Sequence, residues 1–262
     1  MKRSHEILLG LASGLTLVGL WHLGSILQPT AFPGVVETLH ETWRVLNEPG
    51  PYGNPFYYHV YKTAELIFLS LAIAMVVGTI AGIAIGTTRS LEGAASSWIY
   101  GWLALPSLVV VFLSGIWFGF GWSAGLFSVT LIITPFVVLN MWEGALNLDE
   151  ELIEMADFYG ADRLMRFRWV TLPQLIPHVF ASLRSGMSIG WKITLLVETF
   201  LFTHGVGFMF RRAFGNYNLA EVMSWLVIFV IFLLAIEYGV LKPIHQRVTH
   251  WRPDVDGLKG AG

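Results

Sequence analysis

The feature that most constrains this chain is a series of long apolar runs, each close to the length needed to cross a membrane. A transmembrane helix needs about 20 predominantly apolar residues. Charged residues make up 13% of the sequence, whereas soluble domains contain about 25%. We therefore predict an all-α integral membrane protein with about six transmembrane helices, rather than a large soluble helical protein. The apolar runs are 7–27, 66–85, 97–120, 126–142, 179–202 and 222–241.

Composition also narrows the chemistry that this chain can perform. The absence of cysteine excludes disulfides and thiolate metal sites. A net charge of −2 gives no strongly basic field that would favour nucleic acid as a partner. The eight histidines are scattered without paired metal-ligand spacing, and no Ser/His/Asp set can be assigned to an active site. We expect no metal, no catalytic residue and no cofactor bound by this chain.

The first run follows Met1-Lys2-Arg3, as the apolar part of a signal peptide would. The run is too long for that role and lacks a small-residue cleavage site, so we interpret it as a retained first span. The next segment, 28–59, is rich in proline and glycine. Within it, apolar residues recur at helical spacing and predict a short amphipathic helix. This helix would lie either on the outer membrane surface or against the protein's own loops. The recurring residues are Val35, Val36, Leu39, Trp43 and Leu46.

Small and rigid residues inside the runs predict how the spans pack and bend. Gly78, Gly82 and Gly86 recur at every fourth residue and therefore line one helix face, where a neighbouring backbone can approach closely. Pro106 interrupts the third run and Pro135 lies within the fourth. Prolines at membrane depth are tolerated where neighbouring helices or a water-lined cavity satisfy the freed backbone groups.

The distribution of Lys and Arg predicts the orientation in the membrane. Six spans place both termini on one side, and the positive-inside rule identifies the cytosolic side. Eleven Lys and Arg residues lie on the side of the termini and four on the other, with Lys192 inside a span. We therefore predict that both termini, the block 143–177 and the tail 242–262 are cytosolic. The eleven are Lys2, Arg3, Arg89, Arg163, Arg166, Arg168, Arg184, Lys242, Arg247, Arg252 and Lys259, and the four are Arg44, Lys62, Arg211 and Arg212.

The most polar long segment of the chain is 154–173, between the fourth and fifth runs. Acidic residues before and at its start suit the N-terminus of a helix, and its later arginines suit a C-terminal half. Gly160 permits a sharp turn, and Pro173 and Pro177 fix the start of the fifth run. The residues thus predict a short helix, a glycine turn and a rigid return to the membrane, with an ordinary solvated loop as the alternative.

This segment resembles the signature loop of permease subunits of bacterial ABC importers. The family has Glu-Ala-Ala, three residues, Gly, nine residues, an aliphatic residue, any residue and Leu-Pro. Here the sequence has Glu154-Met155-Ala156, Gly160, Val170 and Leu172-Pro173, with Met155 as the departure within the triplet. The resemblance implies that this loop forms a coupling helix that sits in a cleft of an ATPase subunit. The implied coupling residues are Glu154, Met155, Ala156, Asp157, Gly160, Ala161, Leu172 and Pro173.

The resemblance covers roughly residues 27–252 and is strongest to the branch that carries nitrate, sulfonate, taurine, bicarbonate and related small anions. It rests on the proline-rich segment 33–46, the residues 116–121, Glu198, the Gly205-Val206-Gly207 turn and Trp251. The chain departs from the branch at Thr63, Leu66, Ser70, Ser107 and Phe112. The substrate itself therefore stays undefined.

The resemblance implies a type I ABC importer transmembrane fold, formed by residues 1–262 as a single permease domain in a bacterial inner membrane. It also implies a second copy of the chain, two ATP-binding cassette subunits that bind ATP and Mg, and an extracytoplasmic substrate-binding protein. In agreement, the sequence has no G-x-x-x-x-G-K-[ST] loop to hold phosphates. The alternatives are a secondary transporter or channel not driven by ATP, and a membrane-embedded enzyme.

The fifth run contains two charged residues, Lys192 and Glu198. An ionisable group inside a membrane costs on the order of 2.5–3.5 kcal/mol on insertion scales unless it is paired or hydrated. At about 100° per residue, the polar residues of this run form one broad sector, which we predict faces the interior of the helix bundle. They would line an anion pathway, or form a structural network between spans. These residues are Ser188, Trp191, Lys192, Thr194 and Glu198.

Overall fold

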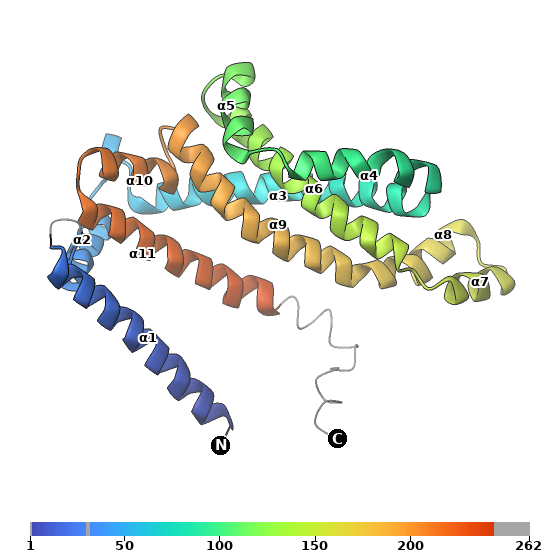
Figure 1. The fold of residues 1–262 in the computed structure, drawn as a ribbon, viewed down its shortest axis with the longest axis horizontal. Coiled ribbons are helices and arrows are strands. Elements are labelled where there is room, and N and C mark those ends of the chain that lie inside the picture. The colour runs from blue at the N-terminus through green and yellow to red at the C-terminus, as the bar shows by residue number, and fades with distance from the viewer. Residues whose placement is uncertain (1, 30–31, 244–262) are drawn as a thin grey trace. The chain divides into compact units, whose positions relative to one another are not determined.

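The computed structural model describes residues 2–29 and 32–243, and every regular element within these ranges is a helix. Residues 244–262, which include most of the predicted tail with Arg247, Trp251, Arg252 and Lys259, lie outside the described ranges. The α-helices are α1 (Lys2–Leu27), α2 (Val35–Asn47), α3 (Phe56–Thr87), α4 (Arg89–Leu103), α5 (Ser107–Phe118), α6 (Trp122–Leu146), α7 (Glu150–Phe158), α8 (Arg163–Arg166), α9 (Leu172–Leu201), α10 (Val206–Gly215) and α11 (Leu219–Ile236) (Figure 1). A 3₁₀ turn, η1 (Pro51–Gly53), and two π-helical turns, η2 (Phe167–Thr171) and η3 (Glu237–Leu241), complete the described elements.

The chain divides into two compact units. The first comprises Met1–Lys62 and His204–Leu233, so that α1, α2 and α10 belong to it. The second comprises Thr63–Thr203 and Leu234–Gly262 and contains α4 to α9. Both α3 and α11 begin in the first unit and end in the second.

Among the described residues, three helical segments are long and apolar enough to cross a membrane: α3, α6 and Leu219–Gly239. The number rises to five if two bent helix pairs each form one span. One pair is α4 with α5, and the other joins Arg163–Leu201 to α10. Within α1, the segment Ala12–Leu27 is apolar but shorter than these three. The prediction of an all-α membrane protein is confirmed, and the described residues contain three to five segments that could be spans.

The third run, 97–120, is interrupted at Pro106 as predicted, and α4 and α5 meet there at an angle of 91°. Pro106 lies just before α5 in an extended conformation, where its missing N–H group costs no helical hydrogen bond. The segment 203–219, between the fifth and sixth runs, contains the helix α10. Pro135, in contrast, lies within the continuous helix α6 as predicted.

The predicted glycine face packs α3 closely against α6 and is confirmed. A methyl group at Gly82 would lie 2.6 Å from both Met141 Cβ and the Val138 carbonyl oxygen. At Gly78 it would lie 2.7 Å from Val137 Cβ, and at Gly86 2.5 Å from Ala145 Cβ. No side chain larger than hydrogen fits at these three positions unless α3 and α6 move apart.

Helix α9 meets its neighbours through a second glycine pair, which the sequence analysis did not single out. A methyl group at Gly186 would lie 2.8 Å from Leu71 Cδ1 on α3, and one at Gly190 would lie 2.9 Å from Ile133 Cδ1 on α6. Helices α3, α6 and α9 thus form the centre of the second unit, in which Leu71 and Ile133 are almost completely buried. This arrangement fixes where α6 ends and α9 begins, and so positions the segment between them.

Replacing Gly82 by alanine tests this packing. The new methyl group has no space, so we expect Gly82→Ala to lower the free energy of unfolding by about 1–3 kcal/mol. A matched control is Gly93→Ala on α4, where a methyl group would have no neighbour within 4 Å. Because alanine favours helix over glycine, that variant should be neutral or up to about 1 kcal/mol more stable. Thermal unfolding in detergent measures both variants, and equal stabilities would contradict the glycine contact.

Candidate functional site

The predicted coupling segment is a helical hairpin, α7 and α8, between the end of α6 and the start of α9 (Figure 1). Asp149 caps α7: its Oδ1 accepts hydrogen bonds from the backbone N–H groups of Glu151 (3.0 Å) and Leu152 (3.3 Å). Glu150 and Glu151 lie in the first turn, where carboxylates stabilise the positive end of the helix dipole. The predicted short helix with an acidic start is confirmed.

Gly160 ends α7 in the left-handed conformation that the predicted sharp turn requires, with φ of +77°. The Ala161 N–H donates to the Ala156 carbonyl, and the Gly160 N–H donates to the Asp157 carbonyl, each at 3.0 Å. This pair of bonds is a Schellman motif, in which a left-handed residue satisfies the last carbonyl groups of a helix. A residue with a Cβ would be strained here, because the left-handed region costs roughly 1–2 kcal/mol for such residues.

Two side-chain contacts hold the hairpin together. Arg166 Nη1 on α8 donates to both carboxylate oxygens of Asp157 on α7, at 2.9 and 2.8 Å. Gln174 Oε1, in the first turn of α9, accepts a hydrogen bond of 2.8 Å from the Asp149 N–H at the start of α7. The hairpin is therefore fixed both across its turn and at its base, where it meets α9.

The return to the membrane begins at α8, whose first turn is capped by Asp162 Oδ1 accepting from the Met165 N–H at 2.7 Å. The π-helical turn η2 follows directly and leads into α9. Pro173 lies in the first turn of α9, where its ring fits without loss of a hydrogen bond. Pro177 also lies within α9, one turn later. Both prolines thus lie at the start of α9 as predicted, although the π turn was not anticipated.

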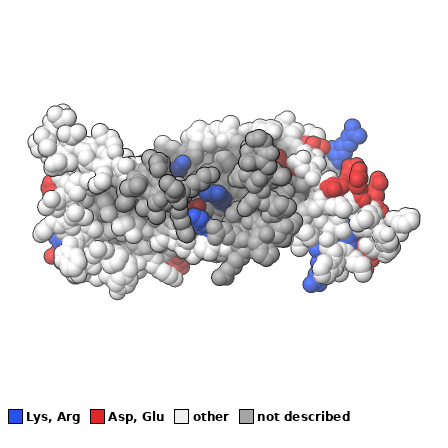
Figure 2. Space-filling model, turned by 90° about the horizontal axis from the view of Figure 1, so that it is seen from below, with Lys and Arg blue, Asp and Glu red and all other residues white. Residues whose placement is uncertain are grey.

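The hairpin exposes both charge and apolar surface. Figure 2 shows charged side chains gathered at the right of the view, over α7 and α8. Large apolar side chains lie beside them on the same hairpin: Phe158 is 87% exposed, Tyr159 80% and Leu164 74%. Exposed apolar surface of this kind with a polar rim marks an interaction site.

The structure brings most of the predicted coupling residues to this exposed hairpin. Glu154, Met155, Asp157 and Gly160 are exposed, while Ala156 and Ala161 are half-buried. Leu172 and Pro173 lie at the base instead, at the start of α9, with Leu172 exposed and Pro173 half-buried. The motif therefore contains two parts, an exposed helix with its turn and a junction to the membrane helix.

The polar residues predicted on the fifth run divide between two faces of α9. Ser188 and Lys192 are exposed, whereas Trp191, Thr194 and Glu198 are buried. Within the described part of the chain, neither Ser188 nor Lys192 has a hydrogen-bond or ion-pair partner. We predicted that all five polar residues face the interior of the helix bundle. Within a single chain, Ser188 and Lys192 do not face it.

The buried members pack inside the second unit. Glu198 Oε2 accepts a hydrogen bond of 3.0 Å from Thr63 Oγ1, which links α9 to α3. The Trp191 ring contacts the Phe68 ring edge-on, with centroids 6.1 Å apart. Glu198 and Trp191 thus join α9 to α3.

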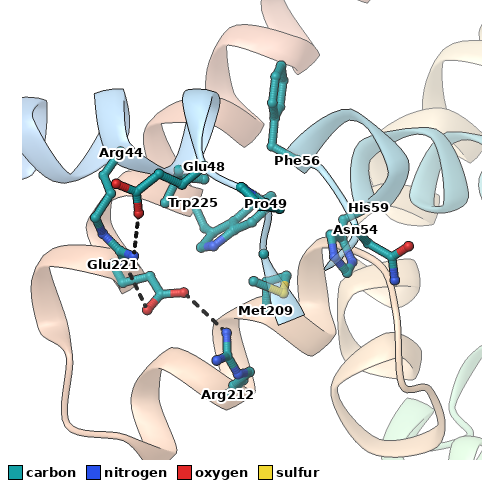
Figure 3. Close-up of a pocket in the computed structure, with 12 residues that line it drawn as sticks. Arg44, Glu48, Pro49, Asn54, Phe56, His59, Met209, Arg212, Glu221 and Trp225 are labelled. Atoms are coloured by element: carbon teal, nitrogen blue, oxygen red, sulfur yellow. Dashed lines mark hydrogen bonds and ion pairs between the residues drawn. The ribbon is translucent and has the colours of Figure 1, made fainter. Parts of the chain in front are cut away.

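A separate pocket of about 190 Å³ lies within the first unit (Figure 3). Trp225 and Met209 line it and are almost completely buried. The buried carboxylate of Glu221 lies between two guanidinium groups, 3.8 Å from Arg44 Nη2 and 3.8 Å from Arg212 Nη1 (Figure 3). Glu221 is on α11 and therefore links Arg44 on α2 to Arg212 on α10.

Glu41 extends this network along α2. It accepts hydrogen bonds from the Arg44 guanidinium, and a further bond of 3.4 Å comes from Asn218 Nδ2. The hydrogen bond from Arg44 and its positive charge hold the pKa of the Glu41 carboxyl below its ordinary value of 4.5. The same pairing raises the pKa of Arg44, which stays charged. Because the charges of this network neutralise one another, it joins helices rather than presenting a free charge.

The hairpin between two membrane helices is the arrangement expected of a transporter subunit, and comparison with known proteins agrees. Residues 66–248 match the family described as the binding-protein-dependent transport system inner membrane component. The chain belongs to this family. It is accordingly a multi-pass protein of the inner membrane and a member of the ABC permeases.

Two relatives illustrate the branch. The chain is 25% identical to the taurine transport system permease protein TauC of Escherichia coli strain K12, over 96% of this chain and 92% of TauC. It is 27% identical to the aliphatic sulfonates transport permease protein SsuC of the same strain, described as putative, over 57% of this chain and 56% of SsuC. The predicted branch is confirmed.

A solved structure shows the same fold. A chain of the MetNI methionine ABC transporter, in an inward-facing conformation, aligns with a TM-score of 0.65 at 20% identity. The alignment covers 73% of this chain and 94% of that chain. The predicted type I ABC importer transmembrane fold is therefore confirmed.

The sequence alone did not identify several residues that shape these sites. Gly186 and Gly190 carry the same four-residue spacing as the α3 glycines, so this signal was available. Asp157 and Arg166 are nine residues apart, and no helical periodicity pairs them. Glu221 is separated from Arg44 by most of the chain, so only the fold brings them together.

The lowered pKa of Glu41 makes the link between α2 and α11 depend on pH. A carboxyl whose pKa is lower in the folded state adds stability above its unfolded value, and this contribution is lost as the pH falls through the folded value. We expect Glu41→Gln to be less stable than the native protein near neutral pH by about 1 kcal/mol, the size of a partly exposed ion pair.

The difference between Glu41→Gln and the native protein should shrink as the pH falls below 4.5, the ordinary value for this group. Unfolding midpoints recorded between about pH 6 and pH 3 measure this effect. Glu143→Gln is a suitable control, since Glu143 is exposed on α6. A constant difference for Glu41→Gln across this range would contradict the assignment.

Proposed function

We propose that this chain forms the translocation pathway of an ATP-driven importer for a small anionic solute and couples to a separate ATPase through the α7–α8 hairpin. The observation that carries this proposal is the exposed helix that ends at Gly160 and bears the family's motif residues. In the proposed role, the exposed apolar side chains of α7 and α8 enter a cleft of the ATPase. Charged residues of the hairpin, such as Glu154 and Arg163, surround that contact.

Coupling requires that motion of the hairpin reach the membrane helices. The Asp157–Arg166 pair makes the hairpin rigid across its turn, and the bond from Asp149 to Gln174 attaches its base to α9. A displacement of α7 would therefore act on the start of α9, where Leu172 and Pro173 lie. Helix α9 carries Lys192 at its exposed face, so the same helix joins the ATPase contact to the pathway.

The proposed assembly has two copies of this chain, two ATP-binding cassette subunits that hold ATP and Mg, and an extracytoplasmic substrate-binding protein. The chain itself is proposed to have no enzymatic activity and to bind no cofactor. Both termini, the block 143–177 and the tail 242–262 would be cytosolic in a bacterial cell. The segment 28–59 would then lie on the extracytoplasmic side of a single permease domain.

Lys192 supports an anionic substrate. Its ammonium group lies on the exposed face of an apolar helix, next to Ser188. Facing lipid would be unfavourable, on the order of 2.5–3.5 kcal/mol on insertion scales, so this face is expected to meet water or a second chain. We place Ser188 and Lys192 on the pathway, with Trp191, Thr194 and Glu198 behind them. TauC and SsuC are named for taurine and aliphatic sulfonates, which carry a negative sulfonate group.

A secondary transporter that uses an ion gradient is the second candidate. This function would need a carboxylate within the membrane that takes up and releases a proton, and Glu198 is the candidate. Glu198 is buried and hydrogen-bonded to Thr63, which suits a packing role better. Uptake by purified protein in vesicles, driven by a proton gradient without any ATPase, would support this candidate against the first.

Replacing Gly160 tests coupling. We expect Gly160→Val to strain the turn, because a β-branched residue disfavours positive φ. Substrate uptake should fall at least tenfold while the assembled complex still hydrolyses ATP, since the strain of about 1–2 kcal/mol is local to the hairpin. Gly160→Asn is the matched control, because asparagine tolerates the left-handed region. Normal uptake by Gly160→Val would contradict the coupling role.

Replacing Lys192 tests the pathway separately. We expect Lys192→Met to abolish uptake of taurine, alkanesulfonate and nitrate, or to shift the preference among them, with the ATPase still bound. Lys192→Arg keeps the charge and should retain measurable uptake. Uptake assays in proteoliposomes, together with co-purification of the ATPase, distinguish loss of transport from loss of assembly. Native transport by Lys192→Met would refute the pathway role.

A further inference from the structure

Helix α2 has three faces instead of the two that an ordinary amphipathic helix has. At about 100° per residue, its side chains fall into three adjoining sectors. One sector is buried, one is apolar and exposed, and one is polar or charged. The buried sector holds Thr38, Thr42 and Val45; the exposed apolar sector holds Val36, Leu39, Trp43 and Leu46; the polar sector holds Glu37, His40, Glu41 and Arg44.

The face that packs against the protein is largely polar. Thr38 is fully buried, and its carbonyl oxygen accepts a hydrogen bond of 3.2 Å from Ser224 Oγ on α11. Thr42 is also buried and donates to the same carbonyl oxygen at 2.7 Å. A helix on the surface of a soluble protein would turn its apolar residues inward and its threonines outward. Here the threonines face inward.

The apolar sector consequently points away from the protein. Val36 is 80% exposed, Trp43 69%, Leu39 59% and Leu46 38%. These four residues recur every three or four positions and so form a continuous stripe along the helix. A stripe of this kind beside a charged sector is the pattern of a helix that lies in a membrane interface.

The neighbouring helix α1 indicates that lipid covers the apolar stripe of α2. Helix α1 exposes apolar side chains along its described length, among them Leu15, Leu20 and Leu27. In an inner-membrane protein such a surface faces lipid. The Trp21 indole N–H on α1 donates to the Pro33 carbonyl, just before α2, at 2.9 Å. The chain thus passes from a lipid-facing helix through a short connection directly into α2.

We propose that α2 is an interfacial helix that rests in the bilayer surface, with its apolar stripe in contact with lipid. The charged sector would face water, and the threonine face would pack on α11. Because Arg44 and Glu41 bind Glu221 and Asn218, the bilayer-resting helix is also tied to the start of α11. The bilayer would thereby hold the ends of α10 and α11 at one depth.

The absence of native cysteine allows a direct test. Single cysteines at Leu39 and Trp43 in the stripe, and at Glu37 and His40 as matched controls in the charged sector, can each carry a nitroxide spin label. The full-length protein is placed in nanodiscs of phosphatidylethanolamine and phosphatidylglycerol. Collision rates with oxygen, which concentrates in lipid, and with a nickel chelate, which stays in water, are then measured.

The proposal expects labels at Leu39 and Trp43 to collide more with oxygen than with the nickel chelate, and labels at Glu37 and His40 to show the reverse. Equal access of the nickel chelate to both pairs would overturn it, since the helix would then be surrounded by water. Protection of Leu39 and Trp43 from both reagents would also overturn it, because a second copy or another protein would cover the stripe.

A second measurement keeps the test valid if spin labelling perturbs the helix. The same cysteine variants in proteoliposomes are treated with a water-soluble maleimide. Labelling at Leu39 and Trp43 should be at least tenfold slower than at Glu37. Equal labelling rates at the three positions would overturn the proposal, because the stripe would then face water.

Discussion

The close approach of helix backbones at glycines is the constraint on which the second unit depends. In lipid, burying apolar side chains does not drive helices together, because lipid tails are equally apolar. Association then depends on packing, and small residues allow the most contact. Gly78, Gly82 and Gly86 bring α3 onto α6, and Gly186 and Gly190 bring α9 onto both. These contacts hold α6 and α9 at fixed positions, and so fix the two ends of the α7–α8 hairpin.

The hairpin itself is held by a different kind of interaction. It lies outside the apolar core and has no buried residue in α7 or α8, so packing cannot order it. Helix caps and one bidentate ion pair take over that role, together with the Gly160 turn. Such contacts hold a short segment in one conformation without a buried core. Their position at both ends of α7 leaves the surface between them exposed.

The two charged residues in the apolar part of α9 lie in different surroundings. Glu198 is buried and hydrogen-bonded to Thr63, which makes its burial tolerable. Lys192 lies on the same helix but on the exposed face. Six residues, less than two helical turns, therefore separate a residue that joins α9 to α3 from one that faces outward. The first unit shows the related arrangement of Glu221 between Arg44 and Arg212, where opposite charges compensate one another.

The sequence alone was sufficient for the membrane class, most helix positions, the glycine face of α3, the turn at Gly160 and the family. Each of these depends on local periodicity or on a residue whose backbone preference is strong. Tertiary structure decided the bend between α4 and α5, the helix α10 and the separation of Lys192 from Glu198. It also decided the pairs Asp157–Arg166 and Arg44–Glu221 and the outward direction of the α2 stripe. These features depend on which distant segments become neighbours, and no periodicity within one segment contains that information.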